Sequence, residues 1–286
     1  MTLDDTLIAP FTHFAFLRRA LVACIVLSVS GAPLGFFMNQ RRMALVSDAM
    51  SHAILPGVAV AFLVAGAGVL SLTIGGLIAG VVMALAAVAL SRYAHLREDA
   101  VFTLLFLLSL TSGIVLLSLK GSNLDLLRLL FGDVLAMDDA SLIFMTGVAV
   151  VTLHTLALIY RGLILDGFDP DFLRASGRGR GTRLLFFAVF MINLVAAFQA
   201  LGTLMALGLM LLPSLAAGFW TRRVNVALPL GILIAVGSSI AGLLISFHAN
   251  TPAGPTVVLV CGSMCLASAL VGPEGSARIG LRRGGA

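Results

Sequence analysis

The sequence predicts an all-α polytopic membrane protein, and two observations carry that prediction. Hydrophobic residues make up 60% of the 286 residues and charged residues only 11%, whereas about 25% of an ordinary soluble domain is charged. Apolar stretches of membrane-spanning length, each about 20 residues long, recur from one end of the chain to the other and leave no room for a soluble domain. We therefore expect one integral membrane domain over residues 1–286.

The first segment, residues 1–17, precedes the first apolar span. Asp4 and Asp5 stand where a secretory signal would carry positive charge, so we do not expect this segment to be cleaved. We expect it to form an amphipathic stretch that lies on the membrane surface.

Nine apolar segments are expected to span the membrane. The count falls to eight if residues 183–221 form one helix, but a segment of that length is too long for one crossing. The interruption Gln199-Ala-Leu-Gly-Thr203 favours a tight hairpin between two short helices. The nine segments lie near residues 18–38, 43–65, 69–91, 99–119, 138–160, 183–201, 203–221, 226–247 and 254–272.

Basic residues predict the orientation, because short cytoplasmic loops are rich in Lys and Arg. Of the eighteen basic residues, the nine-span arrangement places fourteen on one side. This puts the C-terminus and its tail, residues 273–286, in the cytoplasm and the N-terminus outside. The net charge of +5 then reflects topology, and no nucleic-acid-binding module is indicated. The four on the outer side are Arg18, Arg19, Lys120 and Arg128.

Asp48 is the only acidic residue that falls well inside a predicted span, and His52 follows it four residues later. This spacing places both on one face of a helix, where they could offer oxygen and nitrogen ligands to a divalent metal. Pro56-Gly57 is expected to weaken the helix just past His52 and to free backbone carbonyls, as in the broken helices of transporter sites. The alternative is that Asp48 hydrogen-bonds to a neighbouring helix and His52 packs in the core. We favour the functional interpretation because ionisable groups inside a membrane are costly.

Other polar residues in the spans are further candidates for the metal path. His154 lies in the fifth span, His248 at the outer end of the eighth, and Asn193 in the sixth. Each could serve as a ligand or as an ordinary packing or hydrogen-bonding residue, and Gln199 is similar to Asn193 in this respect. The three cysteines all fall in apolar spans, where packing is favoured over metal binding; they are Cys24, Cys261 and Cys265.

The loop after the fifth span has the pattern of a short helix. Asp169 suits the N-cap, Pro170 the first helical position, Asp171 the first turn and Gly177 the position past the end. A helix of about two turns is marginal alone and needs a partner. The segment is therefore either a surface turn or a helix that docks onto another subunit.

These motifs together resemble the permease subunits of zinc, manganese and iron ABC importers, and are most similar to the zinc type. The resemblance covers residues 20–270, in the order of the family's motifs. The matching segments are Arg41-Arg-Met…Ser-Asp48-Ala-Met-Ser-His52-Ala…Pro56-Gly-Val-Ala, Ser122-Asn-Leu-Asp-Leu…Leu130-Phe-Gly-Asp133-Val-Leu-Ala, Phe168-Asp-Pro-Asp…Gly177, Leu201-Gly-Thr…Leu211-Leu-Pro213-Ser-Leu-Ala-Ala and Gly242-Leu-Leu-Ile-Ser246…Thr251-Pro-Ala-Gly-Pro255-Thr-Val-Val-Leu.

The resemblance implies a homodimer around a central pore in the lipid of a bacterial cytoplasmic (inner) membrane. It implies that Asp48 and His52 form the pore metal site, and that residues 169–177 dock onto a cytoplasmic ATP-binding subunit. An extracytoplasmic metal-binding protein is the implied donor. Asn250 stands where zinc permeases often carry Asp, so a possible anionic ligand near the outer gate is missing, and Asn250 is kept as a possible path residue. Leu173 replaces a common Ala of the docking helix.

The expected function is ATP-driven import of a divalent transition metal, with Zn²⁺ as the main expectation and Mn²⁺ or Fe²⁺ as the alternative. The chain itself is not expected to be an enzyme or to hold a permanent cofactor, since it contains no Gly-x-x-x-x-Gly-Lys-Ser/Thr phosphate loop. A proton-coupled secondary metal transporter is a further alternative. An intramembrane metalloprotease is disfavoured, because the chain lacks a His-Glu-x-x-His helix.

Overall fold

The described part of the chain is helical throughout. The computed structural model describes residues 9–41, 43–66, 68–93, 98–119, 137–168 and 179–274, and within these ranges it contains ten helices and no strand. The all-α prediction is confirmed. The helices are α2 (Ala9–His13), α3 (Ala15–Gln40), α4 (Ala44–Ala65), α5 (Val69–Tyr93), α6 (Glu98–Leu119), α8 (Asp139–Phe168), α10 (Gly179–Leu201), α11 (Thr203–Gly218), α12 (Val224–Ala249) and α13 (Ala253–Val271).

Each of the nine predicted spans coincides with one of the helices from α3 to α13. Within the described residues, five of them are long and apolar enough to cross a membrane, namely α3, α8, α10, α12 and α13. The protein is thus an integral membrane protein, while the count of nine crossings stays a prediction.

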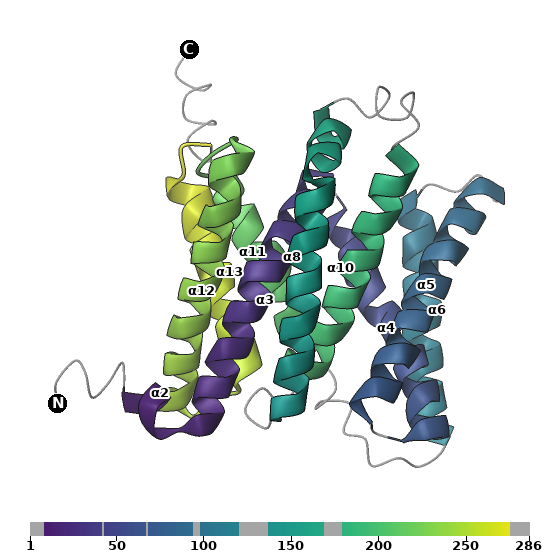
Figure 1. Ribbon diagram of the computed structural model, residues 1–286, viewed down its shortest axis with the longest axis horizontal. Coiled ribbons are helices and arrows are strands. Elements are labelled where there is room, and N and C mark those ends of the chain that lie inside the picture. The colour runs from purple at the N-terminus through teal and green to yellow at the C-terminus, as the bar shows by residue number, and fades with distance from the viewer. Residues whose placement is uncertain are drawn as a thin grey trace.

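The helices stand side by side in a bundle, with α4, α5 and α6 forming one edge of it (Figure 1). α4 packs mainly against α5 and α6, and α3 packs against α8, α11 and α12. α10 connects the two groups, because it contacts α5 on one side and α8 and α11 on the other. Most of the largest fully buried side chains lie on α3 and α10, among them Phe37, Phe186, Phe190 and Leu194.

From α3 to α13, contacts between the described helices show that successive helices run in opposite directions. α3 and α8 run parallel, because Arg19 pairs with Asp139 near their starts and Arg41 with Asp166 near their ends. α4 and α5 run antiparallel, since Gly57 meets Gly75 while Ile54 meets Gly76. As a result, α2 and the end of α13 lie at opposite ends of the bundle (Figure 1).

Three of the described connections contain a residue with positive φ, which are Gly66 after α4, Gly202 after α10 and Asn250 after α12. Gly202 separates α10 from α11 with φ 83°, a conformation that glycine adopts without steric cost. The predicted interruption of residues 183–221 into two helices is therefore confirmed. Asn250 ends α12 with φ 52° and ψ 40°, in the left-handed region that Asn tolerates better than most residues.

Several sequence predictions fall outside the described residues. These include the docking helix at 169–177, the segment that contains Lys120, Arg128 and Asp133, most of the tail at 273–286, and residues 1–8 of the surface segment. The three cysteines are described; all are buried and free, in line with a packing role.

Candidate metal site on α4

α4 places residues 48 and 52 one helical turn apart, as the sequence predicts. The helix runs without interruption from Ala44 to Ala65, so it is not broken at Pro56. The predicted helix break is therefore wrong, although one carbonyl still loses its helical donor. Pro56 has no N–H, and the carbonyl that such an N–H would meet is that of residue 52.

His52 lies on α4, and its half-buried side chain faces α6. Its ring meets the ring of Phe106 edge-on, with centroids 5.0 Å apart. Its backbone carbonyl accepts a hydrogen bond of 3.4 Å from the hydroxyl of Ser109, also on α6. Buried Ser47 and Ser51 directly precede residues 48 and 52 on the same helix. The side chain of Asp48 lies outside what the structure describes.

Small residues bring the neighbouring helices close to α4. A Cβ on Gly57 or on Gly75 would collide with the carbonyl oxygen of the other, so α4 and α5 cross at backbone contact. On the other side, a Cβ on Gly113 of α6 would lie 3.1 Å from the Cβ of Leu55 and 3.2 Å from the nitrogen of Pro56. Close packing through small residues is how helices associate in lipid, and here it holds the turn that carries His52.

The other candidate path residues are not gathered around His52. His154 is exposed on α8 and His248 is exposed at the end of α12. The Nδ1 atom of each lies 2.8 Å from the carbonyl oxygen four residues before it. Asn250 is exposed and closes the turn after α12. Among the residues that the structure describes, no three His, Cys, Asp or Glu side chains lie close enough to hold a metal ion.

The two amides of α10 take part in contacts between helices. Asn193 is buried, and its Nδ2 donates to the hydroxyl of Thr152 on α8 at 3.2 Å. Gln199 donates through Nε2 to the hydroxyl of Thr73 on α5 at 2.8 Å. For both residues the interhelical role, which the sequence left open, is present in the structure.

A buried acidic residue lies near the end of α8. The fifth apolar segment extends beyond its predicted end at residue 160 to Phe168, and so includes Asp166, which sequence reasoning missed. The Asp166 carboxylate lies 2.7 Å from the Arg41 guanidinium, with side-chain exposures of 5% and 11%. The guanidinium also stands 4.9 Å from the centre of the Phe186 ring. The carboxylate that pairs with Arg41 thus lies 125 positions further along the chain.

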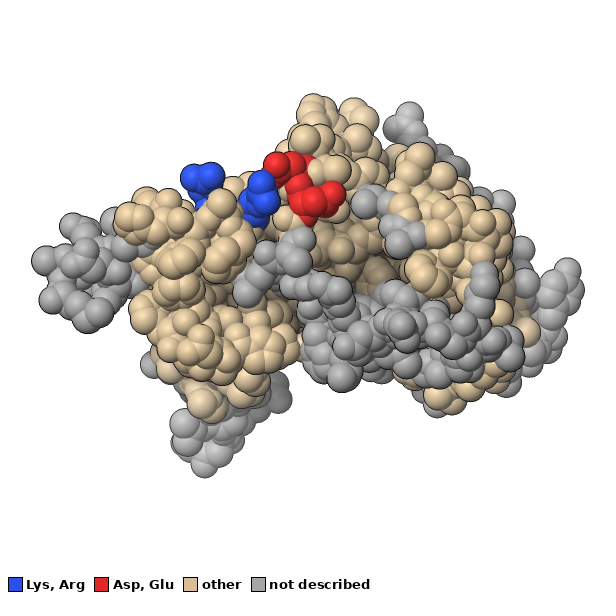
Figure 2. Space-filling model, turned by 90° about the horizontal axis from the view of Figure 1, so that it is seen from below, with Lys and Arg blue, Asp and Glu red and all other residues tan. Residues whose placement is uncertain are grey.

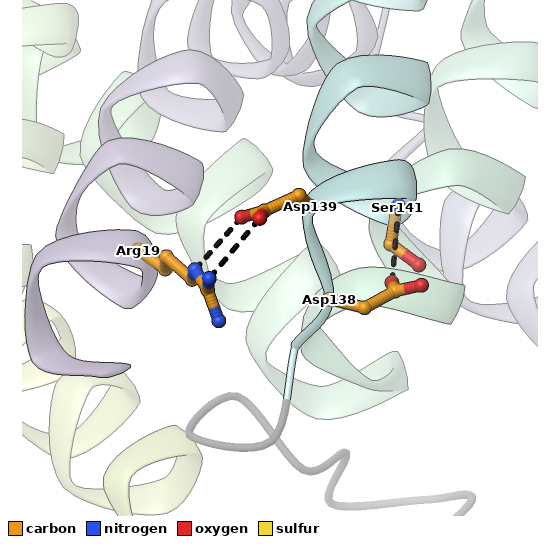
Figure 3. A network of polar contacts seen from close by, with 4 residues as sticks. All are labelled: Arg19, Asp138, Asp139 and Ser141. Carbon is orange, nitrogen blue, oxygen red and sulfur yellow. Dashed lines mark hydrogen bonds and ion pairs between the residues drawn. The ribbon is translucent and has the colours of Figure 1, made fainter. Parts of the chain in front are cut away.

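Arg19, one of the basic residues on the predicted outer side, forms an ion pair with Asp139 at the start of α8. Two of its nitrogens contact the two carboxylate oxygens of Asp139, at 2.8 and 3.1 Å (Figure 3). Asp138 precedes α8 and accepts a 3.1 Å hydrogen bond from the backbone N–H of Ser141, as an N-cap does. The side-chain and backbone hydrogen bonds from Ser141 hold the pKa of Asp138 below its ordinary value.

Seen from below, acidic and basic side chains lie next to each other on a described surface that is otherwise mostly uncharged (Figure 2).

Comparison with known proteins identifies a family that matches almost the whole chain. The ABC 3 transport family matches residues 13–272. The manganese transport system membrane protein MntC of Halalkalibacterium halodurans is 33% identical over 253 residues, which are 88% of this chain and 85% of that protein. The chelated iron transport system membrane protein YfeD of Yersinia pestis is 30% identical over 254 residues, which are 88% of this chain and 83% of that protein.

A solved structure has the same fold over almost the whole chain. PsaBC from Streptococcus pneumoniae, in complex with Fab, aligns with a TM-score of 0.83 and 27% identity. The alignment covers 94% of this chain and 96% of that one.

Proposed function

The chain belongs to the ABC 3 transport family, and we propose that it is the permease subunit of an importer for Mn²⁺ or Fe²⁺. The observation that carries the proposal is the match of the whole helical bundle, residues 13–272, to that family. The expectation of Zn²⁺ gives way to its alternative, because the relatives named above are manganese and iron transport proteins.

Asp48 and His52 are the proposed ligands of the metal in transit. A carboxylate and an imidazole form a hard-to-borderline pair that accepts Mn²⁺ and Fe²⁺ as well as Zn²⁺. The one-turn spacing on an unbroken α4, the half-buried imidazole and the close packing of α5 and α6 support this assignment. Because the transported metal must leave the site again, a site of moderate affinity suits transport better than a closed site of high affinity.

Energy is proposed to come from a separate cytoplasmic ATP-binding subunit, because the sequence has no phosphate-binding loop. Residues 169–177, with Asp169, Pro170, Asp171 and Gly177, are the proposed contact with that subunit. We further propose a homodimer that receives its metal from an extracytoplasmic binding protein. Nine crossings would place the C-terminus in the cytoplasm and the N-terminus outside. The opposite positions of α2 and the end of α13 support an odd number of crossings, and the excess of basic residues on one side supports the orientation.

A metal-uptake assay tests the proposal. Cells that lack their own Mn²⁺ and Fe²⁺ importers would express the chain with its ATP-binding and metal-binding partners, and radiolabelled Mn²⁺ uptake would be measured against excess Fe²⁺ or Zn²⁺. We expect ATP-dependent Mn²⁺ uptake that Fe²⁺ inhibits more strongly than Zn²⁺. Absence of Mn²⁺ uptake together with uptake of radiolabelled Zn²⁺ in a parallel assay would restore the zinc assignment, and uptake without an ATP-binding subunit would indicate a secondary transporter.

A further inference from the structure

The turn of α4 that carries His52 lacks one backbone hydrogen bond of an ordinary helix. Pro56 cannot donate to the carbonyl of His52, yet α4 stays helical through this point. A carbonyl without a donor in a membrane interior is costly, and neighbouring helices commonly supply a donor at such prolines. The hydroxyl of Ser109 on α6 supplies one, at 3.4 Å.

The packing of α6 is arranged around the same turn. Phe106, three residues before Ser109, meets the His52 ring edge-on at 5.0 Å. Gly113, four residues after Ser109, lets the α6 backbone approach Leu55 and Pro56 so closely that a Cβ there would be tight. One face of α6 therefore contacts the imidazole, the carbonyl and the proline of a single turn of α4.

We propose that Ser109 is a positioning residue of the metal site, acting through the carbonyl of His52. This inference rests on the proposed function, because it assumes that His52 binds the transported metal. By replacing the donor that Pro56 lacks, Ser109 holds the turn from His52 to Pro56 in helical geometry and so keeps the imidazole in register with residue 48. Outer-shell groups of this kind affect metal sites by orienting the ligands.

The proposal makes a prediction that simple packing does not make. In Ser109→Ala the carbonyl of His52 loses the Ser109 donor, and Mn²⁺ affinity should fall about 10-fold, as is typical when a supporting hydrogen bond is lost. Adding Pro56→Ala restores a backbone N–H that can donate to the same carbonyl. In the Pro56→Ala background, the further change Ser109→Ala should therefore alter affinity by no more than about twofold, because the two donors substitute for each other.

The experiment measures equilibrium binding of MnCl₂ to the purified complex of the permease with its ATP-binding subunit, by dialysis and elemental analysis. It compares the wild type with Ser109→Ala, Pro56→Ala and the double variant. Ser112→Ala is the matched control, since that hydroxyl is exposed and bonds only to the Ser109 carbonyl of its own helix among the contacts described. It should bind Mn²⁺ like the wild type. Uptake by Ser109→Ala should show a raised KM with a nearly unchanged maximal rate.

Wild-type affinity in Ser109→Ala, or a loss that Pro56→Ala leaves in place, overturns the inference. If Ser109→Ala does not assemble, the Mn²⁺ affinities of Pro56→Ala and of the double variant are compared instead. Equal affinities support the inference, and a lower affinity in the double variant overturns it. Failure of the proposed function looks different. In that case the wild-type complex binds no Mn²⁺, or binds it equally well when Asp48 is changed to Asn.

Discussion

At the scale of single residues, the charge of Asp48 is the feature on which the proposed transport depends. Asp48→Asn keeps the size of the side chain and its capacity for hydrogen bonds, but it removes the charge that compensates the cation in a low-dielectric setting. We expect Mn²⁺ uptake to fall to the level of cells without the permease, while the protein still assembles in the membrane. Uptake of radiolabelled Mn²⁺, normalised to permease content, is the measurement.

His13→Ala serves as the control for that experiment, because His13 is an exposed residue of α2. It should transport at the normal rate. Asp48→Asn and His13→Ala behaving alike would show that the metal site lies elsewhere.

Asn193 allows a test of whether a buried amide belongs to the metal path or only joins two helices. Its Nδ2 donates to Thr152, while its Oδ1 is buried without a donor among the described residues. Replacing both partners by apolar groups of similar shape removes the need for the hydrogen bond and can be neutral or stabilising. We therefore expect Asn193→Leu combined with Thr152→Val to match or exceed the wild type in thermal stability in detergent.

Transport by the same double variant separates the two roles. Normal Mn²⁺ uptake is expected if Asn193 only joins α8 and α10. A stable protein with lost uptake would instead make Asn193 a path residue, as the sequence allows.

At the scale of helices, the pair of Arg41 and Asp166 holds the end of α3 against the end of α8. Asp166→Asn would remove the carboxylate that pairs with the buried Arg41 guanidinium, and breaking a buried ion pair by removing one partner typically costs about 3 to 5 kcal/mol. Replacing both, as in Arg41→Met with Asp166→Leu, should cost much less, because no buried charge remains. Thermal unfolding of the purified protein would measure both effects.

The exposed pair of Arg19 and Asp139 is the matched control, since its side chains are 41% and 68% exposed. Asp139→Asn should change stability by less than about 1 kcal/mol, as is usual for exposed ion pairs. Equal losses in Asp166→Asn and Asp139→Asn would mean that burial of the Arg41 pair does not matter to stability.

The crossing of α4 and α5 depends on glycine at the point of contact. Gly75→Ala places a methyl group against the carbonyl oxygen of Gly57, so the helices must separate and the protein should unfold at a lower temperature. Gly147→Ala is the control, because a Cβ at Gly147 meets no atom within 4 Å. There the helix preference of Ala should leave stability unchanged or slightly raised. A Gly75→Ala protein as stable as Gly147→Ala would contradict the backbone contact.

At the scale of the whole molecule, the topology makes a claim about which turns face the cytoplasm. Arg222, in the turn before α12, and Thr251, in the turn after it, are both exposed and lie at opposite ends of that helix. With intact cells and a membrane-impermeant thiol reagent, we expect Thr251→Cys to be labelled and Arg222→Cys to be protected. The native cysteines are buried and should not react. The reverse pattern would invert the orientation and move residues 169–177 outside the cell.

Local sequence patterns were enough to predict the class of the protein and the places of its helices, and they make Asp48 and His52 the candidates for the metal site. These follow from local properties, because hydropathy over about 20 residues defines a span and a spacing of four defines a shared helix face. The tertiary structure decided which helices lie side by side, and with them the partners of His52, Arg41 and Arg19. Ser109 lies 57 positions from His52, and Asp139 lies 120 positions from Arg19. No local pattern specifies such pairs, because each depends on how the whole bundle packs. The position of Pro56 in the sequence indicates that the carbonyl of His52 lacks its helical donor. Only the packing of α6 against α4 shows that the hydroxyl of Ser109 donates to this carbonyl.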